Sequence, residues 1–81
     1  PIDTSVIRTE HVIHLADQTY INEYEVFQDA WFDTFGYRLN DKTMEKHFAD
    51  YCYHNTIPVW VESYVRKTIE KDNLCKMEEK Q

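Results

Sequence analysis

The sequence predicts a mainly α-helical fold: one compact small domain of three helices, or of four if the N-terminal segment is helical as well. Aromatic residues recur at helical spacing between residues 20 and 35, which is typical of the buried stripe of an amphipathic helix. Residue types that favour helix starts and helix ends stand at the boundaries of this stripe and of two apolar stripes later in the sequence. A length of 81 residues fits a single domain, residues 1–81, rather than two.

Residues 1–8 are expected to form an extended arm, and the run that follows them, residues 9–16, is ambiguous. Its branched apolar residues favour a strand, whereas Thr9 is able to cap a helix. A lone strand would have nothing to pair with in this chain and would need a second subunit. We therefore expect a helix here, and a strand remains the alternative.

The segment from Tyr20 to Phe35 is expected to be the central helix. Asp17 or Thr19 would be its N-cap. Gly36, the only glycine in the chain, would end it, because glycine tolerates the positive φ found just past helix ends. Five aromatic residues fall within an arc of roughly 80° and should form the buried stripe: Tyr20, Tyr24, Phe27, Trp31 and Phe35.

Two further helices follow short connectors, which favour compact packing. Asn40 or Asp41 would cap the second helix, which would end near Asn55. Its buried side would carry Met44, Phe48, Tyr51 and Cys52. Thr56 followed by Pro58 would begin the third, because proline fits the first turn of a helix. The third helix would run from Pro58 to about Asp72 with a stripe of Ile57, Trp60, Val61, Tyr64, Val65 and Thr68. Residues 73–81 would be a polar tail that either extends it or lies free.

The net charge of −6 belongs entirely to the first part of the chain. Residues 1–36 contain seven acids against one base, Arg8, a difference of six, whereas eight acids meet eight bases from Tyr37 onward. Phosphate binding needs basic clusters, so the sequence argues against direct nucleic-acid or anionic-membrane binding. No apolar run reaches the roughly 18 residues of a membrane span, and no leader is expected. Cys52 and Cys75 are expected to be reduced thiols of a cytoplasmic protein.

The polar side of the central helix carries Glu25, Asp29 and Asp33, each four residues from the next. Such like-charge pairs each cost a few tenths of a kcal/mol, and Asp33 also lies near the helix C-terminus, where the helix dipole disfavours anions. The face is either simply solvated or reserved for a basic partner. One form of the second alternative is a DNA-mimic inhibitor, but carboxylates about 6 Å apart are sparse beside one duplex charge per roughly 1.7 Å.

Several apolar residues have no obvious place in one thin core. We expect Phe32, Val59 and Trp60 to anchor a partner, although Trp60 also fits a core stripe. Apolar groups on several faces of a small domain indicate burial against another chain. The sequence therefore predicts a protein–protein interaction module, such as a small acidic adaptor, regulator or inhibitor subunit. Its partner would be a basic protein or a second copy in a homodimer, bound through Glu25, Asp29, Asp33, Phe32, Val59 and Trp60.

Metal binding by His47, Asp50 and His54 is a further alternative. Their spacing places them within about 60° of arc on the second helix, and imidazole and carboxylate groups bind zinc, iron or manganese. Asp50 and His54 would also form an ordinary surface pair, so no cofactor is predicted. The sequence does not predict an enzyme either. Cys52 points away from both histidines, and a single glycine cannot form a phosphate-binding loop.

Overall fold

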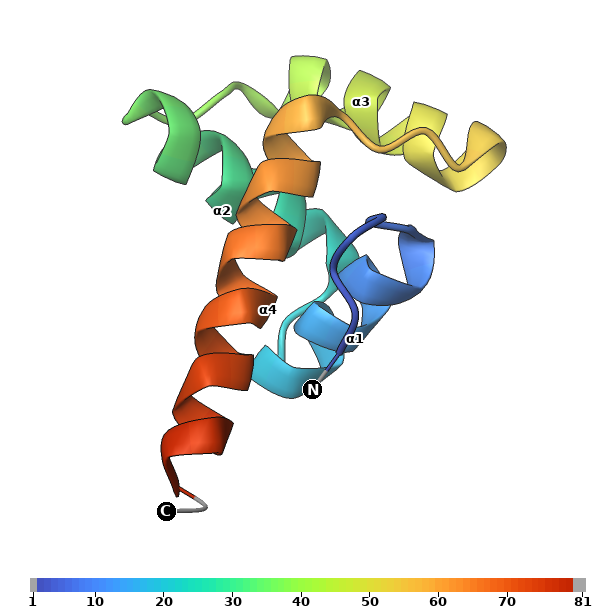
Figure 1. Ribbon diagram of the computed structural model, residues 1–81. Coiled ribbons are helices and arrows are strands. Elements are labelled where there is room, and N and C mark those ends of the chain that lie inside the picture. The colour runs from blue at the N-terminus through green and yellow to red at the C-terminus, as the bar shows by residue number, and fades with distance from the viewer. Residues whose placement is uncertain (1, 80–81) are drawn as a thin grey trace.

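The structure is a computed structural model that describes the backbone of residues 2–79 and the side chains of residues 2–75. This range holds four α-helices and no strand (Figure 1). They are α1 (Thr9–Thr19), α2 (Glu23–Phe35), α3 (Asp41–His54) and α4 (Val59–Glu79). The prediction of a mainly α fold is confirmed, and the ambiguous N-terminal segment is helical.

The N-terminal arm, residues 2–8, lies against α4 and the start of α1. The backbone of Ile2 exchanges two hydrogen bonds with the side chain of Asn73, and Arg66 donates to the Thr4 carbonyl. The N-cap of α1 is Arg8 rather than the predicted Thr9. The buried ring of His11 takes the place of the Glu or Gln found at the third residue of a capping box, because its Nδ1 accepts the Arg8 N–H at 3.0 Å.

The N-terminal boundary predicted for α2 is wrong. Tyr20 takes a left-handed conformation with φ 60° and ends α1, so neither Asp17 nor Thr19 caps the next helix. Asn22 is the N-cap instead, and its side chain accepts from the Glu25 N–H at 2.8 Å. Tyr20, predicted to be buried in the stripe, is consequently 95% exposed.

The other helix boundaries lie close to the predicted ones. Gly36 ends α2 with φ 78°, and Asn40 caps α3.

Cys52, which was predicted to face inward from α3, is exposed. The reason is that α3 packs mainly on α2 through one narrow side, which buries Met44 and Tyr51.

Helix α4 begins directly after Pro58 and continues to Glu79, past the predicted end at Asp72. Residues 73–79 are therefore helical, and residues 80–81 of the predicted tail lie outside the described range. Contacts with α1 and α2 bury one side of α4. The core contains Ile7, Val12, Leu15, Ala16, Val26, Phe27, Ala30, Met44, Tyr51, Val61, Val65 and Ile69.

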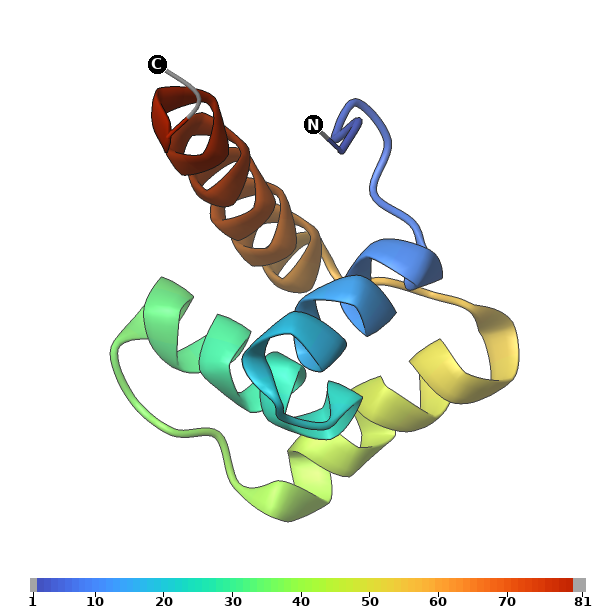
Figure 2. The ribbon, with the colours of Figure 1, turned by 90° about the horizontal axis from the view of Figure 1, so that it is seen from below.

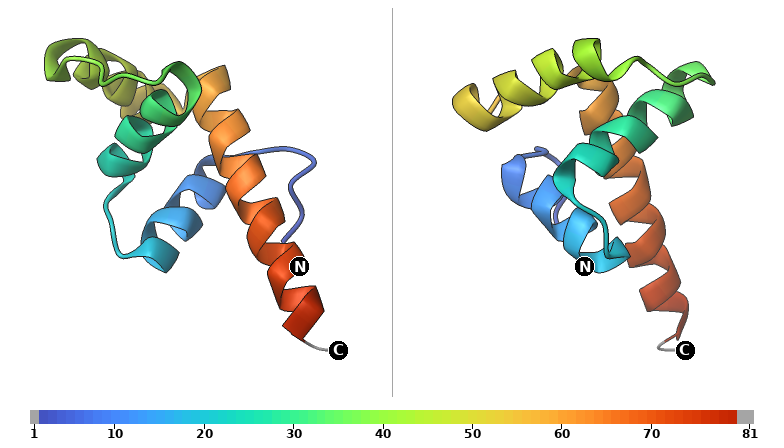
Figure 3. Two further views of the ribbon diagram at one scale, coloured as in Figure 1. Left: turned by 90° about the vertical axis from the view of Figure 1, so that its left-hand side faces the viewer. Right: turned by 180° about the vertical axis from the view of Figure 1, so that it is seen from behind.

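The protein is elongated because the C-terminal half of α4 projects beyond the other helices (Figures 1 and 3). Its radius of gyration is 13.1 Å, against about 12 Å expected for this length. Its accessible surface is 5734 Å², against roughly 5,200 Å² expected for a monomer of this mass. No helix in the described range combines the length and apolar character needed to cross a membrane.

Candidate protein-interaction face

An aromatic cluster joins α2, α3 and α4. Its centre is Phe27, which is fully buried. The centroid of the Phe27 ring lies 5.3 Å from that of Phe48, 5.1 Å from Tyr51 and 5.8 Å from Trp60. Edge-to-face pairs at such distances contribute beyond the area that they bury, so this cluster fixes the positions of the three helices around α2.

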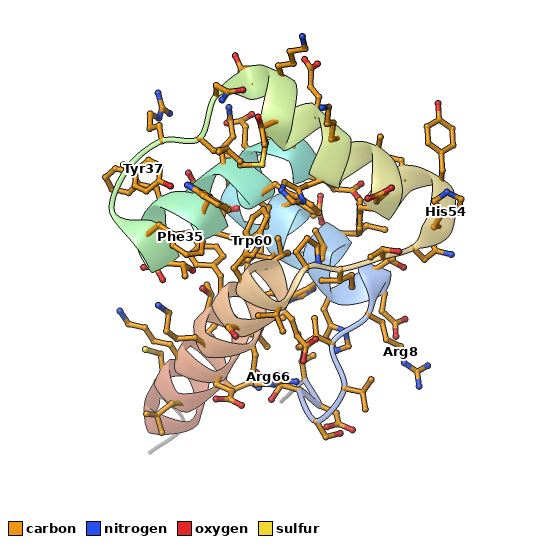
Figure 4. All side chains as sticks on the ribbon, turned by 90° about the horizontal axis from the view of Figure 1, so that it is seen from above. Arg8, Phe35, Tyr37, His54, Trp60 and Arg66 are labelled. Carbon is orange, nitrogen blue, oxygen red and sulfur yellow. The ribbon has the colours of Figure 1, made fainter. Side chains whose placement is uncertain are left out.

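The cluster continues to the surface at the C-terminal end of α2. The Trp31 ring lies 5.2 Å from Trp60, 4.1 Å from Phe35 and 6.0 Å from Tyr37, measured between centroids. Phe35 and Tyr37 are 47% and 57% exposed, and Phe32, on the adjacent side of α2, is 54% exposed. We call Phe32, Phe35 and Tyr37 the aromatic patch. Figure 4 shows Phe35 and Tyr37 at the same end of the molecule, with Trp60 further inside.

The stripe prediction is therefore wrong for Phe35, which was expected to be buried. The last turn of α2 extends past the helices that cover its first turns (Figure 1), so only one side of the Phe35 ring meets the cluster. Sequence reasoning also left Tyr37 out of the candidate site. The sequence signal that could have identified Tyr37 was its position directly after Gly36, which ends a helix whose last turn is aromatic.

The three predicted carboxylates differ in their surroundings. Asp33 forms an ion pair with Lys67 of α4, and the Glu25 carboxylate accepts the N–H of Asn22 at 3.5 Å. Within the described residues, Asp29 makes no hydrogen bond or ion pair. Burial, followed by the charge of Glu25, raises the pKa of Asp29, and Arg38 opposes that shift. The ionised form of Asp29 is thus disfavoured by its surroundings.

The two predicted anchors on α4, Val59 and Trp60, differ in exposure and in their contacts. Val59 is 76% exposed at the first residue of the helix. Trp60 is only partly buried, but its ring contacts Phe27, Trp31 and His47, so it supports the aromatic patch rather than projecting from it. Consecutive helical residues differ by about 100° around the axis, which turns Val59 away from the direction of Trp60 and the patch.

The residues proposed for metal binding do not form a site. The His47 ring packs edge-on against Trp60, with centroids 5.4 Å apart, and stacks on Trp31 at 6.5 Å. Asp50 and His54 are exposed. Among the described residues, no three or more His, Cys, Asp or Glu side chains are grouped as a metal ion would require. His47 is instead a member of the aromatic cluster.

A shallow hollow of about 430 Å³ lies elsewhere, between the start of α2 and α3. Its lining is largely apolar and consists of Tyr24, Glu45, Phe48, Ala49, Cys52 and Tyr53. Tyr53 is 82% exposed and belongs to the last turn of α3. It is thus an exposed aromatic residue remote from the aromatic patch, which makes it a useful comparison in binding experiments.

Comparison of the chain with protein-family models, with curated proteins and with solved structures yields no match. The function is therefore argued from the surface itself. Two half-exposed rings that pack on Trp31, with Phe32 exposed on the adjacent side of α2 and carboxylates on the same helix, are suited to binding a surface that offers apolar and cationic groups.

Proposed function

We propose that this chain is a small protein-interaction module that binds a basic partner protein through the aromatic patch and the neighbouring acids of α2. The observation that carries the proposal is the aromatic patch itself. Phe35 and Tyr37 are held by ring contacts with Trp31, yet about half of each remains open to solvent. Rings fixed in this way lose little side-chain freedom on binding, and buried aromatic anchors dominate the energy of many interfaces.

The charge on Asp29 supports a partner of opposite sign. Its surroundings raise its pKa, which means that the ionised carboxylate is less stable there than in water. Charges that lower the stability of a fold are a common feature of functional surfaces. The positive charge of a Lys or Arg side chain from a partner would offset the effects of burial and of the Glu25 charge on Asp29, while the apolar stem of that side chain covered the rings.

The same surface gives less support to DNA mimicry. Lys67 neutralises Asp33, and Arg38 lies near enough to influence Asp29. The row of carboxylates on α2 is thus interrupted by positive charges, whereas a duplex carries an unbroken series at roughly 1.7 Å intervals. A protein partner that contacts both rings and carboxylates suits this surface better, as expected of an adaptor, regulator or inhibitor subunit.

The proposal is tested by site-specific photo-crosslinking in cells that produce the protein. A photoreactive phenylalanine at position 32 should trap a discrete partner, and the Asp29→Lys variant should lose it. The matched control carries the same group at Tyr53, which is more exposed than Phe32 but remote from the patch. Equal trapping at both positions, or trapping at position 32 that survives Asp29→Lys, would refute the proposed binding face.

A further inference from the structure

We propose that the N-terminal arm, residues 2–8, is a pH-controlled strap on α4, which is released when the ring of His11 takes up a second proton. The inference concerns a different surface from the aromatic patch and does not rest on the proposed function. Figure 4 shows Arg8 and Arg66, which border the arm, away from Phe35 and Tyr37.

The arm is attached to α4 at few points and mainly through its backbone. It runs beside α4 from the start of α1 toward the C-terminal half of α4 (Figure 2). Arg66 donates to the Thr4 carbonyl at 3.0 Å, and Asn73 binds the N–H and the carbonyl of Ile2 at 3.1 and 2.9 Å. Among residues 2–8, only Ile7 is buried. A segment with so few buried contacts opens at a low free-energy cost.

His11 links the arm to α1 and is neutral while the arm is docked. Its Nδ1 accepts the Arg8 N–H at 3.0 Å, so this nitrogen carries no proton. Its Nε2 lies 2.8 Å from the Asp3 carbonyl, which can only accept, so Nε2 carries the single proton of the ring and donates it. Both nitrogens of a ring that is 8% exposed are thus bound to backbone groups.

A second proton is incompatible with this arrangement. It would occupy Nδ1, so two donors, the ring N–H and the Arg8 N–H, would point at each other and the Arg8 N–H would lose its acceptor. The new positive charge would lie at the third residue of α1, where the helix dipole disfavours cations. The ring would turn away and release the Asp3 carbonyl. Water reaches the ring through a hollow of about 560 Å³ between the arm and α1.

The charged and titratable groups around the ring come from the arm, α1 and α4. They are Asp3, Arg8, Glu10, His14, Glu62, Arg66 and Glu70.

Asp3 is the group that most directly favours a charged ring, but its attraction is weak. Hydrogen bonds from Ser5 lower the pKa of Asp3 more than the charge of His11 does. The Asp3 carboxylate is exposed, so water screens its attraction for the ring. Glu62 and Arg66 compensate each other as an ion pair, and the two remaining carboxylates are exposed. The lost hydrogen bond of the ring therefore decides that the docked arm prefers neutral His11.

The direction of the pH dependence follows from this preference. Because the released arm allows His11 to bind a second proton, docking weakens as the pH falls. Histidine is the side chain that ordinarily changes charge between about pH 5 and 8. Release would leave Arg66 and Asn73 without their backbone partners and would uncover Ile7, so a new surface on α4 would open in mildly acidic solution.

Nuclear magnetic resonance of the full chain between about pH 7.5 and 5 tests the strap, because Asp and Glu ordinarily remain charged above about pH 5. At the upper pH, the ¹⁵N shifts of His11 should show the proton on Nε2. As the ring titrates, the side-chain amide signal of Asn73, which reports the bond to Ile2, should move with the same midpoint. The protection factor of the Arg8 N–H against hydrogen exchange should fall at least about tenfold, because a buried donor loses its acceptor.

Two variants provide matched controls. His11→Gln supplies a capping-box residue that accepts the Arg8 N–H without titrating, so the arm should stay docked throughout. His14→Gln alters a histidine that lines the same hollow and should leave the transition unchanged.

Four results would each overturn the strap. These are a proton on Nδ1 at neutral pH, protonation of His11 that leaves the Asn73 signal in place, no titration of the ring above about pH 5, and a transition that persists in His11→Gln. If circular dichroism shows that His11→Gln does not fold, the wild-type signals of His11 and Asn73 still decide between coupled and independent titration.

Discussion

Replacing Phe27 by alanine tests whether the aromatic cluster holds α2 in place. Phe27 is fully buried and its ring lies within 6 Å, between centroids, of three other rings. Loss of a buried phenylalanine costs about 3–5 kcal/mol, and edge-to-face pairs add about 0.5–1.5 kcal/mol each beyond their area. We therefore expect Phe27→Ala to lower the free energy of unfolding by about 5 kcal/mol, the upper end of the range for a buried phenylalanine.

That loss is large for a chain of 81 residues. At about 0.05–0.15 kcal/mol per residue, its total free energy of unfolding is roughly 4–12 kcal/mol. Urea denaturation followed by far-UV circular dichroism would measure the change, and an unchanged slope with denaturant would show that the unfolding reaction is the same. If Phe27→Ala proves largely unfolded, Phe27→Leu offers a smaller change at the same position.

Phe32→Ala is the matched control, because Phe32 lies on the same helix but is 54% exposed. Only part of its ring leaves water on folding, and alanine favours a helix more than phenylalanine does, so the loss should stay below about 1 kcal/mol. Equal losses for the two variants, or a loss below about 2 kcal/mol for Phe27→Ala, would refute this account of which rings form the core.

Three other substitutions probe charge, ionisation and backbone conformation. Asp29→Asn should stabilise the fold by a few tenths of a kcal/mol at pH 7, because it removes a charge that is disfavoured by partial burial and by repulsion from Glu25. Since the pKa of Asp29 is raised in the folded state, this gain should disappear as the pH falls through that pKa, which urea titrations across the acid range would show. Burial, followed by the hydrogen bond to Glu23, raises the pKa of Tyr51 above its ordinary value of about 10. Stability should therefore fall as the pH rises above about 10, and less steeply in Tyr51→Phe than in the wild type. Gly36→Ala should cost about 1–2 kcal/mol in the same denaturation assay, because φ is 78° there, while no heavy atom outside Gly36 and its two chain neighbours lies within 4 Å of the added carbon.

Helix boundaries that depend on neighbouring residues were predictable from the sequence. Asn40 caps α3 through a hydrogen bond to the N–H of Thr43 three residues later, and Gly36 ends α2 because it adopts a positive φ without strain. The start of α2 was not predicted, since it requires Tyr20 in a left-handed conformation that non-glycine residues rarely adopt. The capping box formed by Asn22 and Glu25 was a readable signal for the true boundary.

The candidate site was predictable only as a set of residue types. Periodicity placed Phe27 and Phe35 in one stripe, but the crossing of α4 over α2 decides that Phe27 is buried and Phe35 is half-exposed. The pairing of Asp33 with Lys67 joins residues 34 positions apart, a distance over which local pattern carries no information. Which acids keep an unneutralised charge is therefore a property of the tertiary structure.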